Sequence, residues 1–135
     1  GSAAALPADI TQESDVIAAF DRAMAPGTGL DPVDLVAYNA GNNQHIDLRE
    51  LTAEQFESFW RVGCYGGFLV GREAARRMVP LGRGTVLFTG ASASLRGKPG
   101  YAHFAAAKAG LRMLAQSMAR EYGPQGIHVA HVVID

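Results

Sequence analysis

A tyrosine and a lysine in the C-terminal half of the chain have side chains suited to proton transfer. A phenol is an acid with a pKa near 10, and a neighbouring ammonium group lowers that pKa. Tyr101 precedes Lys108 by seven residues, so both project from one face of a predicted helix. Their Cα atoms are then about 10 Å apart along the helix axis, which is too far for strong coupling. We therefore favour a packing role for Tyr101 over an acid–base role, while keeping it as a candidate catalytic residue.

Two serines follow a predicted strand in a loop of small residues that runs from 90 to 100. The hydroxyl of Ser92 or Ser94 could approach a ligand there, and Ser92 is the candidate catalytic serine. The alternative, which we favour, is that both hydroxyls satisfy backbone groups of the loop.

No metal site is predicted. His128 and His131 are three residues apart on a predicted strand, so they point to opposite faces of the sheet. His45 and His103 have no carboxylate or thiol at ligand spacing, and Cys64 is the single cysteine, which excludes an internal disulfide.

The positions of these residues are set by strands and helices that alternate along the whole chain. Short apolar runs predict the end of a strand at 3–8 and buried strands at 35–38, 85–89 and 127–134. Helical spacing of apolar residues predicts helices at 11–25, 52–78 and 101–122, the first capped by Thr11 and the second by a Thr52–Gln55 capping box. The fold class is therefore α/β, a doubly wound parallel sheet with helices on both faces. Ligands of such sheets bind at the C-terminal ends of the strands, here residues 39–41 and 90–94.

Composition limits the function further. The 135 residues suit one domain, 1–135, with 48% hydrophobic residues and a formal net charge of −1. That charge argues against a nucleic-acid partner. No apolar stretch approaches the roughly 18 residues of a membrane span, and the N-terminus lacks the pattern of a secretory signal. We expect a cytoplasmic protein.

Four segments carry a family resemblance when they are read in order. They are Pro7-Ala8-Asp9-Ile10-Thr11, Tyr38-Asn39-Ala40-Gly41, Phe104-Ala-Ala-Ala-Lys108 and the stretch 119–129. Together they resemble the short-chain dehydrogenases/reductases, from the third to the sixth strand of a partial Rossmann-like domain that lacks the first two strands.

The resemblance implies hydride transfer between NAD or NADP and an unknown small alcohol or carbonyl compound. It assigns cofactor binding to Asp9, Asn39, Ala40, Gly41 and Lys108. For three of them a structural role is the alternative to cofactor binding. Asp9, which would contact the adenine, could simply precede the Thr11 cap, and Asn39 could bond neighbouring strand backbone. The Lys108 stem could pack on the sheet with its amine in water.

The departures from the family bear on activity. The chain shows no glycine-rich turn between a first strand and a helix, which holds the pyrophosphate in the family. Phe104, Ala91 and Gly63 stand at the family's tyrosine, serine and asparagine positions. We therefore expect a degenerate active site with weak or no activity.

Four glycines in the predicted helix 52–78 suggest that another backbone approaches it closely, because glycine costs roughly 1 kcal/mol in a helix interior. They are Gly63, Gly66, Gly67 and Gly71. The resemblance implies a homo-oligomer through helices 53–78 and 101–122. We expect Gly66 and Gly67 at that interface. The alternative to an enzyme is a non-catalytic scaffold or nucleotide sensor that self-associates.

Overall fold

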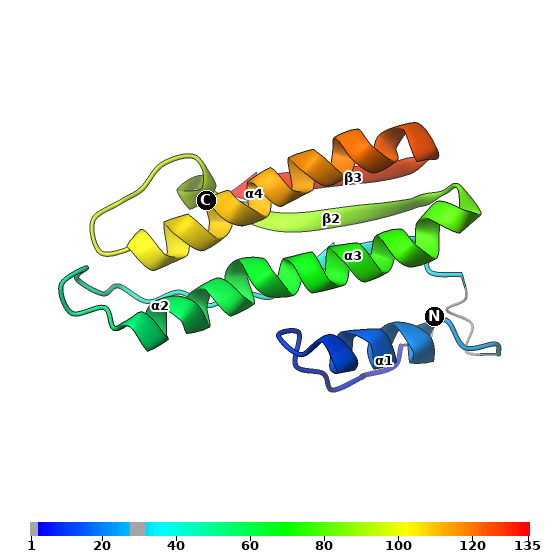
Figure 1. The fold of residues 1–135 in the computed structure, drawn as a ribbon, viewed down its shortest axis with the longest axis horizontal. Coiled ribbons are helices and arrows are strands. Elements are labelled where there is room, and N and C mark those ends of the chain that lie inside the picture. Colours follow the sequence, from blue (N-terminus) through cyan, green and yellow to red (C-terminus); the bar gives the residue numbers. More distant parts are fainter. Residues whose placement is uncertain (1–2, 28–31) are drawn as a thin grey trace.

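The computed structural model describes residues 3–27 and 32–135, in which a parallel sheet lies beside a layer of helices (Figure 1). The strands are hydrogen-bonded in the order β1 (Leu35–Tyr38), β2 (Gly84–Ala91) and β3 (Ile127–Ile134). The helices are α1 (Glu13–Ala23), α2 (Ala53–Trp60), α3 (Gly66–Met78) and α4 (Ala102–Tyr122). A π-helical turn, Arg61–Tyr65, joins α2 to α3. The expected α/β, Rossmann-like class is confirmed.

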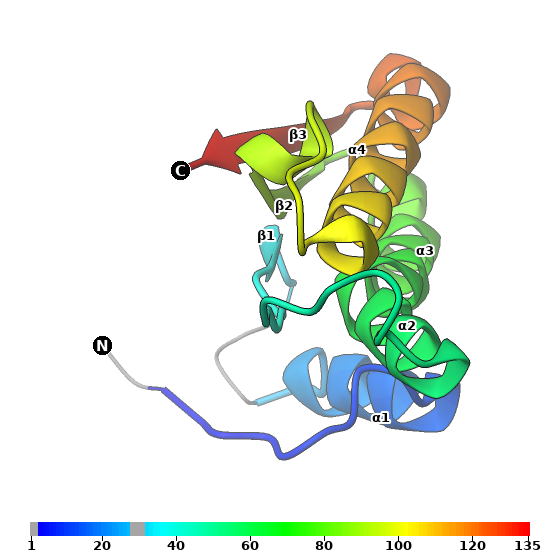
Figure 2. The same cartoon turned by 90° about the vertical axis from the view of Figure 1, so that its left-hand side faces the viewer.

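Chain direction explains why the helices gather on one side of the sheet (Figure 2). The connections from β1 to β2 and from β2 to β3 both step in the same direction across the sheet. Because such crossovers are right-handed, they place α3 and α4 on the same face. The second helical layer that the fold class implies does not occur among the residues that the structure describes.

The predicted strand end at 3–8 is wrong. These residues run without regular structure, and most of them are exposed. The described part of the chain offers them no neighbouring strand, and without a partner a strand has no ladder of hydrogen bonds.

The helix starts were predicted with mixed success. Thr52 and Gln55 form the expected capping box, with both hydrogen bonds at 3.0 Å. The predicted Thr11 cap is wrong, because α1 has Gln12 at its N-cap position without a side-chain cap. The Thr11 hydroxyl instead donates to the Asp9 carboxylate at 2.7 Å.

The glycines of the π turn and α3 face the interior of this chain. A Cβ on Gly63 would lie 2.7 Å from Ala107 Cβ on α4, and one on Gly71 would lie 3.0 Å from the Phe88 ring on β2. Gly66 and Gly67 are likewise buried, against Tyr38 and other side chains of the same chain. The close approach inferred from the sequence is real, but the expectation that Gly66 and Gly67 form an interface with a second copy is wrong.

Tyr38 connects this packing to the C-terminal edge of the sheet. Its ring is buried at the end of β1, and its hydroxyl donates to the Val62 carbonyl oxygen in the π turn. Burial raises the pKa of this phenol, so it stays protonated and keeps donating. The strand end and the helix are thereby held in register beside residues 39–41.

Candidate active site

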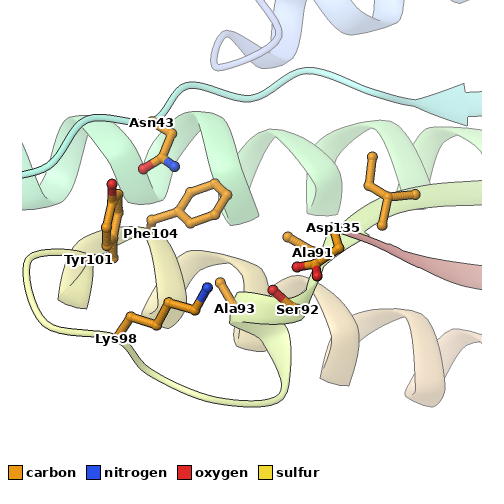
Figure 3. Close-up of a pocket in the computed structure, with 9 residues that line it drawn as sticks. Asn43, Ala91, Ser92, Ala93, Lys98, Tyr101, Phe104 and Asp135 are labelled. Atoms are coloured by element: carbon orange, nitrogen blue, oxygen red, sulfur yellow. The ribbon is translucent and has the colours of Figure 1, made fainter.

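A cavity of about 350 Å³ opens at the C-terminal ends of β2 and β3, beside the first turn of α4 (Figure 3). Its walls come from four segments that are far apart in sequence. The lining residues are Asn43, Ala91, Ser92, Ala93, Lys98, Tyr101, Phe104, Ile134 and Asp135. The sequence placed a ligand site at this edge. The cavity contains two of its candidate catalytic residues, Ser92 and Tyr101.

The rim of the cavity is shaped by a turn that leads into α4. The backbone N–H of Tyr101 donates to the carbonyl of Lys98 at 3.1 Å, and Ile46 donates to the carbonyl of Gly100 at 2.9 Å. Gly100 has φ +81°, a conformation that glycine adopts without strain, and the His45 ring fills the space where a side chain would lie. His45 also meets the Tyr101 ring edge-on, with centroids 5.3 Å apart. The turn therefore presents Lys98 and Tyr101 in fixed positions.

Phe104 lines the cavity and also lies near Lys108. Its ring is part of the cavity wall, while the Lys108 ammonium is 5.7 Å from the ring centroid and is not part of that wall. Lys108 is only 6% exposed, and its Nζ donates to the carbonyl of Thr89 at 2.9 Å. The alternative from the sequence, in which the Lys108 amine lies in water, is therefore wrong. Burial lowers the pKa of this amine.

Lys108 retains unused hydrogen-bonding capacity. An ammonium carries three donors, and among the described residues only the Thr89 carbonyl accepts from it. Gly41 lies beside it, since a Cβ on this glycine would be 3.5 Å from Lys108 Nζ. A buried cation next to a glycine with no side chain in the way is suited to a hydroxyl-bearing ligand, such as the ribose of a nucleotide.

His131, which the sequence considered only for metal binding, lies next to this lysine on the helix-facing side of β3. Its ring occupies the space that a side chain on Gly90 would fill, and its Nε2 is buried without a hydrogen-bond partner in the described chain. Burial, followed by the positive charges of Arg112 and Lys108, lowers the pKa of this imidazole. The expected opposite orientation of His128 and His131 agrees with their burial, because His128 is exposed.

The cavity is lined both by residues without an ionisable group and by polar residues. Phe104 and Ala91 both line it and carry no ionisable atom. Gly63 lies outside it, against Ala107. The hydroxyls of Ser92 and Tyr101 and the charged groups of Lys98 and Asp135 are what the wall offers instead.

Asp9 lies in a different hollow. That hollow, about 430 Å³, is lined by Asp9, Thr11, Glu54, Glu57, Ser58, Arg61 and Val62 and shares no residue with the cavity. The Asp9 carboxylate accepts hydrogen bonds from the backbone and the hydroxyl of Thr11, which lower its pKa. The structure therefore does not bring Asp9 and Lys108 into one pocket, and it shows Asp9 fixing the turn before α1.

The segment 39–41 follows β1 at the same edge of the sheet as the cavity. Asn39 and Gly41 are exposed, and Ala40 packs against the core. The expected hydrogen bond from Asn39 to strand backbone is not formed among residues 3–27 and 32–135.

Sequence reasoning missed four residues of this region: Asn43, Lys98, His131 and Asp135. A signal existed for the first two, since they are polar residues in segments that follow predicted strands. In the described part of the chain, no three His, Cys, Asp or Glu side chains form a group that could hold a metal ion. None of its helices is long and apolar enough to span a membrane.

Comparison with known proteins agrees with this geometry. A family model described as short chain dehydrogenase matches residues 1–134. The "short chain aldehyde dehydrogenase 1" of Euphorbia lathyris is 32% identical over 123 residues, which cover 90% of this chain and 42% of that protein.

Solved structures give the same result. A short-chain dehydrogenase from Rhodopseudomonas palustris superposes with a TM-score of 0.87 at 44% identity, covering 94% of this chain and 58% of the other. A gluconate 5-dehydrogenase from Burkholderia cenocepacia, in complex with NADP and tartrate, gives a TM-score of 0.85 at 26% identity, covering 93% and 48%. The chain thus spans about half the length of these relatives. It belongs to the short-chain dehydrogenase/reductase family of oxidoreductases.

Proposed function

We propose that this protein binds NAD or NADP together with a small polar alcohol or carbonyl compound, and that it transfers hydride slowly. The observation that carries this proposal is the position of Phe104. Its ring lines the cavity and lies near the Lys108 ammonium group, at the position where the family's tyrosine would supply a proton. A ligand in the cavity can be held next to a cofactor there, but Phe104 cannot give it a proton.

The residues around Lys108 fit the ribose end of a nicotinamide nucleotide. Lys108 supplies buried donors, and Gly41 beside it has no side chain that would keep a ligand away from the strand end. The nucleotide, when bound, supplies the hydride. Asp9, in its separate hollow, remains a candidate for the adenine end. The proton would have to come from Ser92, Tyr101 or solvent.

A non-catalytic scaffold or nucleotide sensor is the second candidate function, and an exposed aromatic surface favours it. Phe56, Trp60 and Phe68 on α2 and α3 expose 39%, 38% and 37% of their surface. The Tyr65 ring contacts the rings of Trp60 and Phe68, with centroids 5.7 and 6.2 Å away. We propose that homo-oligomerisation uses this outer surface of helices 53–78, together with helix 101–122. Apolar surface of this kind is typical of interaction sites.

Thermal unfolding of the purified protein with and without millimolar NADH or NADPH separates a nucleotide-binding protein, whether oxidoreductase or sensor, from a scaffold that binds no nucleotide. A ligand that binds only the folded state raises its stability by about 2.7 kcal/mol at a hundredfold excess over Kd. We expect an upward shift of Tm with one nucleotide. Lys108→Met should abolish most of that shift. The Tm measured without nucleotide should not fall, because the buried amine makes a single hydrogen bond.

Arg96→Met is the matched control, because it removes one positive charge from an exposed position that does not line the cavity. A cooperative transition that neither nucleotide shifts would contradict the oxidoreductase proposal and favour the scaffold. A shift that Lys108→Met leaves intact would remove Lys108 from the proposed cofactor site.

A further inference from the structure

Lys98 lies at the cavity wall with its charge uncompensated. The structure gives its ammonium no ion pair and no hydrogen-bond acceptor among residues 3–27 and 32–135. Figure 3 shows the side chain running from the rim toward Ala93, with the nitrogen turned to the cavity. Arg83 and Arg77, by contrast, are paired with carboxylates elsewhere on the surface.

The backbone around Lys98 is fixed before any ligand arrives. Its carbonyl accepts from Tyr101, and the next turn is held by Ile46 and by the packing of His45 on Gly100. The Lys98 side chain itself is exposed, so the fixed backbone determines where the ammonium group starts from but leaves its stem free to adjust to a ligand.

The first turn of α4 adds positive potential to the same rim. Its N-cap residue, Tyr101, provides no side-chain acceptor for the free N–H groups of the turn. A helix N-terminus carries roughly half a positive charge. An anionic group is therefore favoured beside the Lys98 ammonium group, which Figure 3 shows next to Ala93.

The remaining wall is suited to hydroxyl groups. Asp135 and Ser92 both line this cavity, and the carboxylate can accept hydrogen bonds that hydroxyls donate. Asn43 offers an amide beside Tyr101. A volume of about 350 Å³ is near the lower end of ligand pockets, so the ligand is small.

We propose that this cavity selects a small hydroxycarboxylate, or the corresponding ketocarboxylate, whose carboxylate is bound by Lys98 and whose hydroxyl or carbonyl end faces Ser92 and Asp135. This inference rests on the proposed function, because it names the substrate class of that same cavity. Lys98 is thus a specificity-determining residue, and no proton transfer is assigned to it.

The test measures binding of matched ligand pairs that differ in the carboxylate alone. We would titrate the purified protein, with and without millimolar NADPH, with lactate against propane-1,2-diol and with gluconate against glucitol. A charge-assisted hydrogen bond is lost with each alcohol, so at least one carboxylate should bind about tenfold more tightly than its partner. Lys98→Met should remove that preference, and Lys98→Arg should retain it.

Arg96→Met is again the control, since it lies two residues from Lys98 in the same loop and should keep the preference. Equal binding of both members of every pair, no binding of any carboxylate, or a preference that survives Lys98→Met would each overturn the inference. Nucleotide binding is read separately from the thermal shift. A shift without carboxylate preference refutes only the role of Lys98, and carboxylate preference without a shift refutes only the proposed oxidoreductase function.

Discussion

Two regions of the molecule differ in how they are packed. One is the contact of the π turn and α3 with α4, here called the seam, and the other is the region around the cavity. In the seam, small residues let side chains fit closely: Gly63 lies against Ala107, Gly67 against Leu111 and Gly71 against Met118. Around the cavity, polar groups are buried with incomplete partners. They include the Lys108 ammonium, Nε2 of His131 and the Ser94 hydroxyl.

The two regions contribute to folding stability with opposite sign: the packing of the seam stabilises the fold, and the unpartnered polar groups near the cavity destabilise it. Burial of apolar surface stabilises the seam, whereas a buried donor or acceptor without a partner costs about 1–3 kcal/mol. Proteins retain such costs mainly where function requires the group. Unpartnered buried atoms also occur on the helices, at Arg72 Nε and at both ring nitrogens of His103, so it is the cavity together with its polar groups that marks the sheet edge as the place where ligands act.

Filling the seam should have the largest effect. In Gly67→Val the new side chain would collide with Leu111 and Tyr38, which are both buried, so overpacking should cost about 3 kcal/mol of unfolding free energy. Gly97→Val is the control, because nothing lies within 4 Å of a Cβ there. Urea denaturation of the two variants measures the difference. If both lose the same stability, the seam is not as closely packed as described.

Restoring an acid at the cavity should have the next largest effect. Phe104→Tyr combined with Ala91→Ser places a phenol beside the Lys108 ammonium and a hydroxyl across the cavity. General acid–base catalysis contributes about 10²–10⁴-fold, so we expect a rise of about 100-fold in the rate of NADPH-dependent reduction of small ketones or ketocarboxylates.

Phe68→Tyr, on the exposed side of α3, is the control for adding a phenol away from the cavity and should leave the reduction rate unchanged. An unchanged rate in the double variant, together with retained nucleotide binding, would show that more than the missing proton donor limits the reaction.

The same contrast explains how far the sequence alone predicts this molecule. Strands β1 and β3 and the capping box of α2 follow from apolar periodicity and local side-chain chemistry, and all were predicted correctly. The family motif predicted a cofactor-binding role for Lys108, which stays a prediction, whereas its burial and its bond to the Thr89 carbonyl became visible only in the coordinates. The direction in which Gly66 and Gly67 face was predicted wrongly, because periodicity indicates a close approach without identifying the partner.

The cavity wall was only partly predictable. Ser92 and Tyr101 were found from their residue type and position. Lys98 and Asn43 were missed, because their meeting depends on the Gly100 turn and its contact with His45. His131 was considered only as a metal ligand, since nothing in the sequence indicates that its ring packs over Gly90. The spacing of residues along the sequence does not predict contacts between distant segments.

The smallest expected effect concerns pH and His131. Its pKa is lowered in the folded state, so the unfolded chain takes up the proton first as the pH falls. This residue's contribution to stability is therefore complete above the unfolded value of about 6.5 and declines below it. Urea denaturation between pH 7.5 and 5.5 measures this contribution. The free energy of unfolding should fall less steeply with decreasing pH in His131→Gln than in the parent protein. The difference should stay under the roughly 1.4 kcal/mol of one pKa unit, because the ring is only half-buried. His128→Gln, which replaces an exposed histidine on the same strand, is the matched control. Identical slopes in all three proteins would mean that the His131 ring is as well solvated as a surface histidine, and that the contrast between the seam and the cavity region does not extend to β3.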